Sequence, residues 1–515
     1  MDSPAGPLPP EDAEAVSITA TIPDRRALVT KGLIWTGMLQ VFLVGANFLS
    51  MIVLVRLLSP IEYGRVAAVN GITALINCFS CSYFIAQAIQ LHDGEEPDWG
   101  AHWRAGFYIQ LGLFIACNLI ATICWFLPPY RPIAGLLYVA SVGFLLDFPN
   151  QVGLTRLRRD LNYRTLRLVQ MVCTLVTVAS SISLALLGAG AFALIIGYNL
   201  LHGVPQGVYL LVVEKWKPPA GWWRWPNWKA YRAPLKFGAQ LSGSALFSAA
   251  RGMLEAVVLP ITIGYAAVGL LNRAQVLFST TGGRAAAVVV DTVYPLLPRS
   301  AGNAEQFARH ATLFIETMLF ISIPSAVFIA LDGPQLSRLL YGEKWIAADP
   351  LIVASTIFAW AVSTTLLFTA ILQARNRLRL AFLSSVIAAA SAVPAMIVAL
   401  GGAGALSYAW ALAIGQFLAA CIAGRLSSNL LQEGWFVKGI LPSLTATSIG
   451  ALCLFLCKSA LPRMNLLLGF CFDGLVFATV VLLIHRFLFP RLLREIVARL
   501  PGSNRLLNLM CFGSA

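Results

Sequence analysis

The sequence predicts an all-α polytopic membrane protein with about 14 transmembrane helices. Of its 515 residues, 58% are hydrophobic and only 12% are charged, and the mean hydropathy is +0.76. A hydrocarbon core about 30 Å thick requires roughly 20 apolar helical residues, and apolar stretches of that length follow one another along the chain with short loops between them. The expected spans are residues 32–55, 65–91, 103–127, 133–154, 166–187, 191–213, 237–262, 276–298, 309–331, 348–373, 380–400, 404–428, 437–457 and 465–485.

The distribution of basic residues indicates the topology. Most of the 37 Lys and Arg residues fall in the two terminal segments and in the even-numbered loops, which these spans place on one side of the membrane. Because basic loops stay on the cytoplasmic side, both termini are expected to be cytoplasmic. The net charge of +14 is then explained by topology and by contact with anionic lipids, so nucleic-acid binding is not expected.

Three segments outside the spans have compositions of their own. Residues 1–29 are rich in proline and acidic residues and lack a signal-peptide pattern, which predicts a disordered cytoplasmic tail. Residues 214–236 carry five tryptophans among six basic residues, and this favours a linker at headgroup depth over a loop that grips sugar or phosphate. Residues 488–515 begin with an amphipathic pattern, which predicts a helix lying on the cytoplasmic membrane surface.

The cysteines and histidines predict neither a metal site nor a catalytic site. Cys78 and Cys81 form a C-x-x-C pair, but they lie within an apolar helix with no histidine or carboxylate beside them. Structural zinc requires four ligands, and catalytic zinc requires three and a water. The five histidines are scattered and show no Ser-His-Asp spacing. We therefore expect reduced, membrane-buried thiols, no metal, no cofactor and no catalytic residue.

The chain contains an internal repeat. The loop that begins GAGAFAL at Gly188 matches the loop that begins GAGALSY at Gly402, an offset of 214 residues, and YVAS ending at Ser141 matches IVAS ending at Ser355 at the same offset. Two lobes of six spans in the same orientation are typical of transporters that rock about a central site. We expect an N-lobe at 30–213, a linker at 214–236, a C-lobe at 237–430 and two further spans at 431–487.

Several inter-span segments carry recognisable motifs. VRLLSPIEYG (Val55–Gly64) joins the first two spans, and GYAAVGLLNRAQ (Gly264–Gln275), VDTVYPLLPR (Val290–Arg299), LLYGEKWIAADPL (Leu339–Leu351) and LQARNRLR (Leu372–Arg379) lie in the second half. These segments resemble the polysaccharide transporter family, the Wzx-type oligosaccharide flippases of the multidrug/oligosaccharidyl-lipid/polysaccharide exporter superfamily. The resemblance implies a V-shaped, two-lobed fold and translocation of an undecaprenyl-pyrophosphate-linked sugar unit across a bacterial inner membrane. It supplies no single catalytic motif.

Charged residues inside the spans are candidates for function, because a charge at the bilayer centre costs at least about 2.5–3.5 kcal/mol. Arg251 and Glu255 share a helix face, and so do Arg284 and Asp291. Each pair either holds helices together inside a lobe or places its arginine in the gap between the lobes, where guanidinium suits a pyrophosphate. We expect Arg284 to be the main pyrophosphate ligand, because small residues surround it in TTGGRAAA, whereas Arg251 has Glu255 one turn away.

A proline-containing span supplies the candidate for ion coupling. Asp147 and Asn150 flank Pro149, and a proline bends or breaks a helix and frees backbone carbonyls. A carboxylate at such a place can bind Na⁺ or carry a proton, but helix packing explains it equally well. The full set of candidates for ion coupling is Asp147, Asn150, Glu255, Asp291 and Glu316.

Three further arginines, Arg56, Arg65 and Arg273, lie at the outward ends of spans. Their position allows two interpretations. They either line the exit of the cavity and guide the substrate, or they extend to lipid headgroups.

Together these features predict a flippase that works by alternating access in exopolysaccharide, O-antigen or capsule biosynthesis, including that of lipopolysaccharide. No G-x-x-x-x-G-K-[ST] loop is present, so the energy comes from an H⁺ or Na⁺ gradient, the membrane potential or downstream consumption. The expected partners are a polyprenyl-pyrophosphate-linked glycan, anionic lipids, and a polysaccharide polymerase with export proteins.

Two alternatives remain open at this point. A membrane glycosyltransferase or polymerase of the same pathway would need outward acids, and the longest outward loop offers Asp332 and Glu343. A cation-coupled antiporter for small molecules would use carboxylates inside the membrane, and the arginines of the second half argue against it. No enzymatic activity is expected.

Overall fold

The structure is a computed structural model that describes residues 25–89, 91, 95–160, 162–283, 296–460, 465–490 and 493–494. The regular structure in these ranges is helical, without a strand. Twelve of the described helices are long and apolar enough to cross a membrane. The predicted all-α polytopic fold is confirmed, but the count of 14 spans is not. The expected span at 191–213 is interrupted, and about half of the one at 276–298 lies outside the described residues.

The first lobe is built from long helices whose ends are fixed by local signals. At the start of α2, the Ser59 side chain accepts a hydrogen bond from the Glu62 amide, and the Glu62 carboxylate accepts one from the Ser59 amide. Pro60 follows at the first helical position, where its missing amide hydrogen costs nothing. The helices are α1 (Arg25–Leu57), α2 (Pro60–Asn77), α3 (Cys81–Ile85), α4 (Trp99–Phe126), α5 (Arg131–Arg159) and α6 (Tyr163–Leu186).

The sixth expected span is broken into four pieces: α7 (Ala191–Ile195), the π-helical turn η2 (Ile196–Leu201), α8 (Val204–Val208) and the π-helical turn η3 (Tyr209–Val213). Gly203 and Pro205 stand at the break, and neither residue favours a helix interior. Two hydrogen bonds join the break to α5: the Asn150 side chain donates to the Gly203 backbone carbonyl at 3.1 Å, and the Gln206 side chain donates to the Asn150 backbone carbonyl at 2.8 Å.

The second lobe repeats the first. In the first lobe the backbone has a positive φ at Gly188 (82°) and Gly190 (55°). At the equivalent positions of the second lobe it has a positive φ at Gly402 (76°) and Gly404 (81°). Only glycine adopts this conformation at little cost, so the sequence repeat reflects a repeated turn. The helices of this half are α9 (Arg232–Thr262), α10 (Gly264–Thr280), α12 (Leu296–Arg299), α13 (Ala304–Tyr341), α14 (Asp349–Ala374), α15 (Leu378–Ala390), α16 (Ala392–Leu400) and α17 (Gly404–Ser427).

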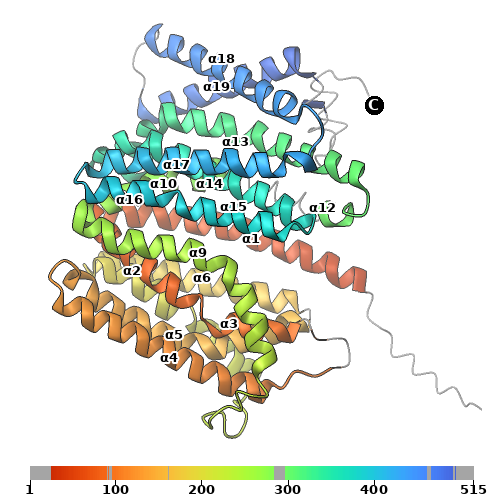
Figure 1. The fold of residues 1–515 in the computed structure, drawn as a ribbon. Coiled ribbons are helices and arrows are strands. Elements are labelled where there is room, and N and C mark those ends of the chain that lie inside the picture. Colours follow the sequence, from red (N-terminus) through yellow and green to blue (C-terminus); the bar gives the residue numbers. More distant parts are fainter. Residues whose placement is uncertain are drawn as a thin grey trace, which may run out of the picture.

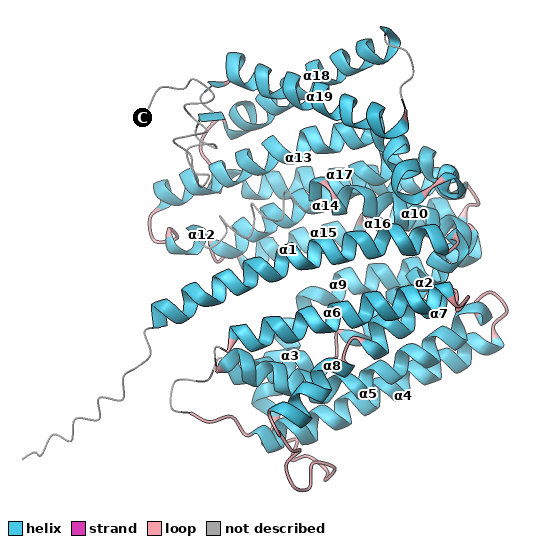
Figure 2. Cartoon of the chain, turned by 180° about the vertical axis from the view of Figure 1, so that it is seen from behind, coloured by secondary structure: helices cyan, strands magenta, loops and turns pink. Residues whose placement is uncertain are grey.

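The two lobes lie one above the other in Figure 1, with α4 and α5 on one outer side and α13 on the other. Figure 2 shows the same order from behind, with α1 and α9 on the sides of the lobes that face each other. Helix α9 packs against α2 and α3 of the first lobe and against α15 and α16 of the second. We call the end of the bundle that carries Ser59 and Gly342 the distal end, and the end that carries the start of α1 the terminal end.

The lobes meet where α2 packs against α10 near the distal end. Two glycines allow this contact: a β-carbon on Gly64 would overlap the Tyr265 carbonyl, and one on Gly269 would overlap the Pro60 carbonyl. Small residues are the usual way for membrane helices to approach closely. The buried apolar core continues through this contact from α1 and α2 into α10, α13 and α14.

Helices α18 (Leu441–Ala460) and α19 (Leu466–Leu488) pack against α13 outside the repeat. An ion cluster fixes them there: the Lys458 ammonium contacts the Asp332 carboxylate of α13 and lies 3.3 Å from the Asp473 carboxylate of α19. Asp332 is fully buried. The prediction that Asp332 lies in an outward loop is therefore wrong, because α13 continues through Gly333 and Pro334 as far as Tyr341.

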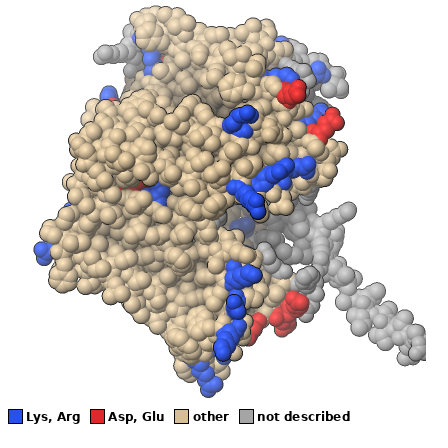
Figure 3. Space-filling model, viewed as in Figure 1, with Lys and Arg blue, Asp and Glu red and all other residues tan. Residues whose placement is uncertain are grey.

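The tryptophan-rich linker packs onto the terminal end of the first lobe. Trp216 lies edge-on to Trp103, with ring centroids 5.4 Å apart, and Trp222 lies edge-on to Phe107 at 5.0 Å. Trp225 is 70% exposed, so only part of the segment joins this cluster. Figure 3 shows Lys and Arg gathered along the side of the molecule on which α12 and the start of α1 lie. The last turns of α5 and α17 contribute Arg156, Arg158, Arg159 and Arg425.

Candidate functional site

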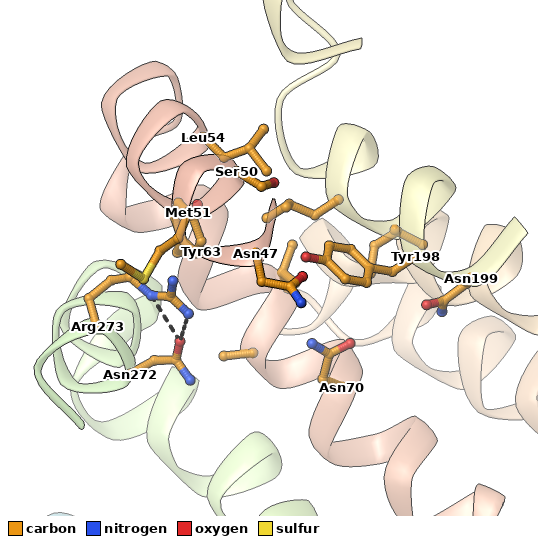
Figure 4. A pocket seen from close by; sticks show the side chains of 14 residues that line it. Asn47, Ser50, Met51, Leu54, Tyr63, Asn70, Tyr198, Asn199, Asn272 and Arg273 are labelled. Carbon is orange, nitrogen blue, oxygen red and sulfur yellow. Dashed lines mark hydrogen bonds between the residues drawn. The ribbon is translucent and has the colours of Figure 1, made fainter. Parts of the chain in front are cut away.

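A cavity of about 300 Å³ opens between the lobes. Its walls come from α1, α2 and the broken sixth span of the first lobe, and from α10 of the second. The lining residues are Asn47, Ser50, Met51, Leu54, Tyr63, Val66, Ala67, Asn70, Leu194, Ile195, Tyr198, Asn199, Asn272 and Arg273. Figure 4 shows Asn47, Asn70 and Tyr198 directed into the same space, with Arg273 on the side of α10.

The polar lining of this cavity is rich in amides. Asn47, Asn70, Asn199 and Asn272 each offer a carbonyl acceptor and two N–H donors. None of the lining residues is an aspartate or glutamate. Amide groups suit sugar hydroxyls, which both donate and accept hydrogen bonds, and their N–H groups also suit phosphate oxygens. The π-helical turn η2 places Tyr198 and Asn199 on this surface, so the interruption of the sixth span shapes the cavity directly.

Arg273 supplies the positive charge of the cavity lining. Its Nε and Nη2 donate to the Asn272 side-chain oxygen at 3.2 and 2.7 Å, and its guanidinium carbon lies 4.4 Å from the centre of the Tyr63 ring. A guanidinium has five N–H donors, and two of them are used by Asn272. The stack and the amide fix the plane of the guanidinium and leave N–H groups for an anion in the cavity.

A second cavity of about 120 Å³ adjoins the first, and Ala67 and Asn272 line both. Glu255 and Tyr408 are part of its wall. The predicted pair of Arg251 and Glu255 is present, with 3.8 Å between the Arg251 Nε and a Glu255 carboxylate oxygen. The Arg251 guanidinium also lies 5.0 Å from the centre of the Phe358 ring. Neither cavity is lined by Arg251, so its geometry favours the interpretation that the pair holds helices together.

Hydrogen bonds between the lobes close the distal end next to the larger cavity. Arg56 donates from Nη2 to the Leu339 carbonyl at 2.6 Å and from Nε to the Leu340 carbonyl at 3.2 Å. Lys344 donates to the Arg56 carbonyl, and the Trp345 indole N–H donates to the Val55 carbonyl at 3.0 Å. We refer to this set, between residues 55–56 and 339–345, as the distal closure. It joins two of the family-like segments of the sequence.

The remaining predicted residues lie elsewhere. The Asp147 carboxylate accepts hydrogen bonds from the Gln151 side chain at 3.0 and 3.1 Å, while Asn150 faces the break in the sixth span. Glu316 packs against Gly439 at the start of the thirteenth expected span. Arg65 is half-buried on α2 and does not line either cavity. Arg284 and Asp291 fall outside the described residues.

Sequence reasoning missed most of the cavity lining. It treated charge inside a span as the signal of function and so passed over Asn47, Asn70 and Asn199. It named Arg273 as a candidate but left its role open between guiding the substrate and extending to lipid headgroups, because that residue is near a span end. A search for uncharged amides inside the apolar stretches would have included the three asparagines, since each lies inside an expected span.

Comparisons with known proteins place the chain in a family. A family model described as "Polysaccharide biosynthesis protein" matches residues 53–350, which is more than half of the chain. The chain is 22% identical over 329 residues to the succinoglycan biosynthesis transport protein ExoT of Rhizobium meliloti (strain 1021), covering 63% of this chain and 65% of that protein, so it spans slightly less than two thirds of the relative's length.

Two solved structures share the fold. A lipid II flippase MurJ in an inward closed conformation has a TM-score of 0.73 at 16% identity, covering 90% of this chain and all of that one. An inward-facing multidrug resistance MATE family transporter has a TM-score of 0.52 at 15% identity, covering 79% of this chain and 95% of that one. These likenesses confirm the two-lobed architecture, and together with the matched family model they show that the chain belongs to the polysaccharide biosynthesis protein family.

Proposed function

We propose that the protein is a flippase that moves polyprenyl-pyrophosphate-linked oligosaccharide units across the bacterial inner membrane for polysaccharide biosynthesis. The observation that carries this proposal is the amide-lined cavity between the lobes, with Arg273 in its wall. Membership of the family and the two-lobed transporter fold support the same conclusion. The protein then acts as a transporter and not as an enzyme.

In this proposal the head group and the lipid tail take different paths. The pyrophosphate binds the free N–H groups of Arg273, because a guanidinium stays protonated and offers paired donors to phosphate oxygens. The sugars contact Asn47, Asn70 and Asn199, and the polyprenyl chain stays in the lipid. Arg284 lies four residues after the end of α10 at Thr280 and outside the described residues, and we retain it as a second candidate ligand on sequence grounds alone.

The distal closure gives the direction of access. We take both termini to be cytoplasmic, as the basic residues predict. The closed end then faces the periplasm, and the substrate enters from the terminal end, where basic residues gather. Rocking of the lobes then breaks the distal closure and exposes the head group on the other side. An inside-negative potential favours the export of an anion by about 2.3 kcal/mol per charge per 100 mV, and an H⁺ or Na⁺ gradient could act through Asp147.

A binding experiment tests the cargo directly. Purified protein is titrated with undecaprenyl pyrophosphate and, in parallel, with undecaprenol. We expect the pyrophosphate to bind more tightly, and Arg273→Ala to weaken its binding by about 10- to 100-fold, since a charge-assisted hydrogen bond contributes about 1.5–3 kcal/mol. The control is Arg131→Ala, which removes an exposed distal arginine that lines neither cavity. Equal binding of both lipids, or no effect of Arg273→Ala, would refute the proposed cargo site.

The glycosyltransferase alternative loses one of its two candidate acids. Asp332 is fully buried in α13 and contacts Lys458, so its carboxylate does not lie in an outward loop where a substrate could reach it. Glu343 remains at the distal end in the 3-10 turn η4 (Glu343–Ala348). Of the two acids that the sequence offered, one therefore remains, whereas glycosyl transfer by carboxylates usually employs an acid and base pair.

A further inference from the structure

Tyr63 touches both the cavity and the distal closure. One face of its ring carries the Arg273 guanidinium at 4.4 Å, and its ring also meets the Trp345 ring edge-on, with centroids 5.5 Å apart. Trp345 is fully buried and donates its indole N–H to the Val55 carbonyl. A continuous contact therefore leads from the cation in the cavity, through Tyr63, to a hydrogen bond that joins the lobes.

The distal closure brings together two helix ends of the same polarity. The Val55 and Arg56 carbonyls belong to the last turn of α1, and the Leu339 and Leu340 carbonyls belong to the last turn of α13. C-terminal helix ends carry partial negative charge and leave carbonyls without intrahelical partners. The Arg56 and Lys344 side chains satisfy them across the lobe boundary. Water can replace these bonds when the lobes part, so a modest change nearby can shift the balance.

We infer that Tyr63 couples the loading of the cavity to the opening of the distal end. The inference rests on the proposed function and adds the way in which the cargo triggers release. An anion that pairs with Arg273 competes with the Tyr63 ring for the guanidinium, because it neutralises the charge that the ring attracts and draws the N–H groups into the cavity. Loss of that stack removes one support of the Tyr63–Trp345 contact, and the distal closure loosens.

Linkage makes the inference quantitative. We take the stack of Arg273 on Tyr63 to exist only in the closed state. An anion that displaces this stack must then favour the open state. By linkage, opening of the distal end must raise the affinity for the anion by the same factor. A cation–π contact of this kind corresponds to about a 2- to 30-fold change in an equilibrium constant. Removing the ring while keeping Arg273 should therefore raise anion affinity and open the distal end without ligand.

The experiment compares variants that break the contact at different points. Tyr63→Leu removes the ring and keeps the cation, Tyr63→Phe keeps the ring, and Arg273→Gln removes the cation and keeps the ring. Spin labels are placed on cysteines introduced at Leu186 and Leu400, which occupy equivalent ends of the two lobes and are each 67% exposed, in a background without native cysteines. Their distance distribution is measured in lipid nanodiscs with and without inorganic pyrophosphate.

We expect pyrophosphate to increase the distal-open fraction of the wild type and of Tyr63→Phe. Tyr63→Leu should be more open without ligand by about 2- to 30-fold, bind pyrophosphate more tightly, and respond little to it. Arg273→Gln should also be more open without ligand but should not bind pyrophosphate. A Tyr63→Leu protein that stays closed and responds to pyrophosphate like the wild type would overturn the inference. If Tyr63→Leu does not fold, an Arg273→Gln protein that stays closed would overturn it instead.

The failure of the proposed function has a different signature. If pyrophosphate does not bind to the wild type, the cargo proposal fails, but the ligand-free distances still decide the inference. Opening in Tyr63→Leu and Arg273→Gln, with closure in Tyr63→Phe, would then establish the mechanical contact alone. Closure in all three variants would refute it.

Discussion

The carbonyl of Tyr265 occupies the place where a β-carbon on Gly64 would stand, so α2 and α10 touch backbone to backbone at the distal end. This contact lies between two family-like segments, and it exists only because residue 64 has no side chain. It sets the distance between the lobes and therefore the closed state of the distal end.

Gly64→Ala should hold the distal end open. The added methyl group overlaps a backbone atom, which cannot move aside as a flexible side chain can, so α2 and α10 must separate. The expected result is a longer distance between labels at Leu186 and Leu400. Gly243→Ala is the matched control, because a β-carbon there meets nothing within 4 Å. An unchanged distance in Gly64→Ala would contradict the role of this contact.

Arg251→Ala should reduce stability more than transport. Glu255 would be left partly buried without its cation, at a cost of about 1–3 kcal/mol. The measurement is the thermal unfolding temperature of the purified protein, together with transport by the fraction that remains folded. The double variant Arg251→Met with Glu255→Leu should recover most of the stability, because it removes the charge and its partner together. A folded Arg251→Ala protein that has lost all transport would show that Arg251 acts on the substrate.

Lys458→Met should detach α18 and α19 from α13. It leaves the fully buried Asp332 without the cation that it contacts, and an uncompensated buried charge costs about 3–5 kcal/mol. The unfolding temperature should fall, and limited proteolysis should cut between α18 and α19 more rapidly. Adding Asp332→Asn should restore part of the loss. An unchanged unfolding temperature in Lys458→Met would mean that packing alone holds these helices.

Asp147→Asn should abolish any dependence of transport on an imposed pH or sodium gradient. The carboxylate is half-buried inside α5, and among the described residues its hydrogen-bond donor is the Gln151 amide and not a basic group, so it is able to exchange a proton or hold a cation. Initial rates in vesicles are compared with and without a gradient. Asp160→Asn, which removes an exposed partner of Arg156, is the control. A gradient effect that survives in Asp147→Asn would place coupling elsewhere.

Apolar length and the internal repeat were enough to predict the fold class but not the site. The spans and the repeat followed from apolar length and from the matched loops at Gly188 and Gly402, because the membrane imposes the first and the turn geometry the second. The end of α13 was misplaced because Gly333 and Pro334 usually end a helix. Here Gly333 packs closely against Ile352, and the helix continues.

For Arg273, the choice between its two predicted roles could not be made from the sequence, for a different reason. Its distance from the end of the span is visible in the sequence, but the face of α10 that turns toward the first lobe is set by the glycine contact at Gly64 and Gly269. The amides of the cavity come from four separate elements, α1, α2, η2 and α10, and their convergence depends on how these elements pack. No local pattern encodes either arrangement.

The measurement that tests the central claim most directly is translocation itself. Vesicles that contain the wild type, Arg273→Ala, Arg273→Lys or Arg131→Ala are loaded with a fluorescent undecaprenyl-pyrophosphate-linked oligosaccharide, and the fraction that reaches the opposite leaflet is followed over time. We predict transport by the wild type and Arg131→Ala, partial transport by Arg273→Lys, which keeps the charge but not the fork of donors, and none above protein-free vesicles by Arg273→Ala. Transport by Arg273→Ala at the wild-type rate, with normal membrane insertion, would contradict the account.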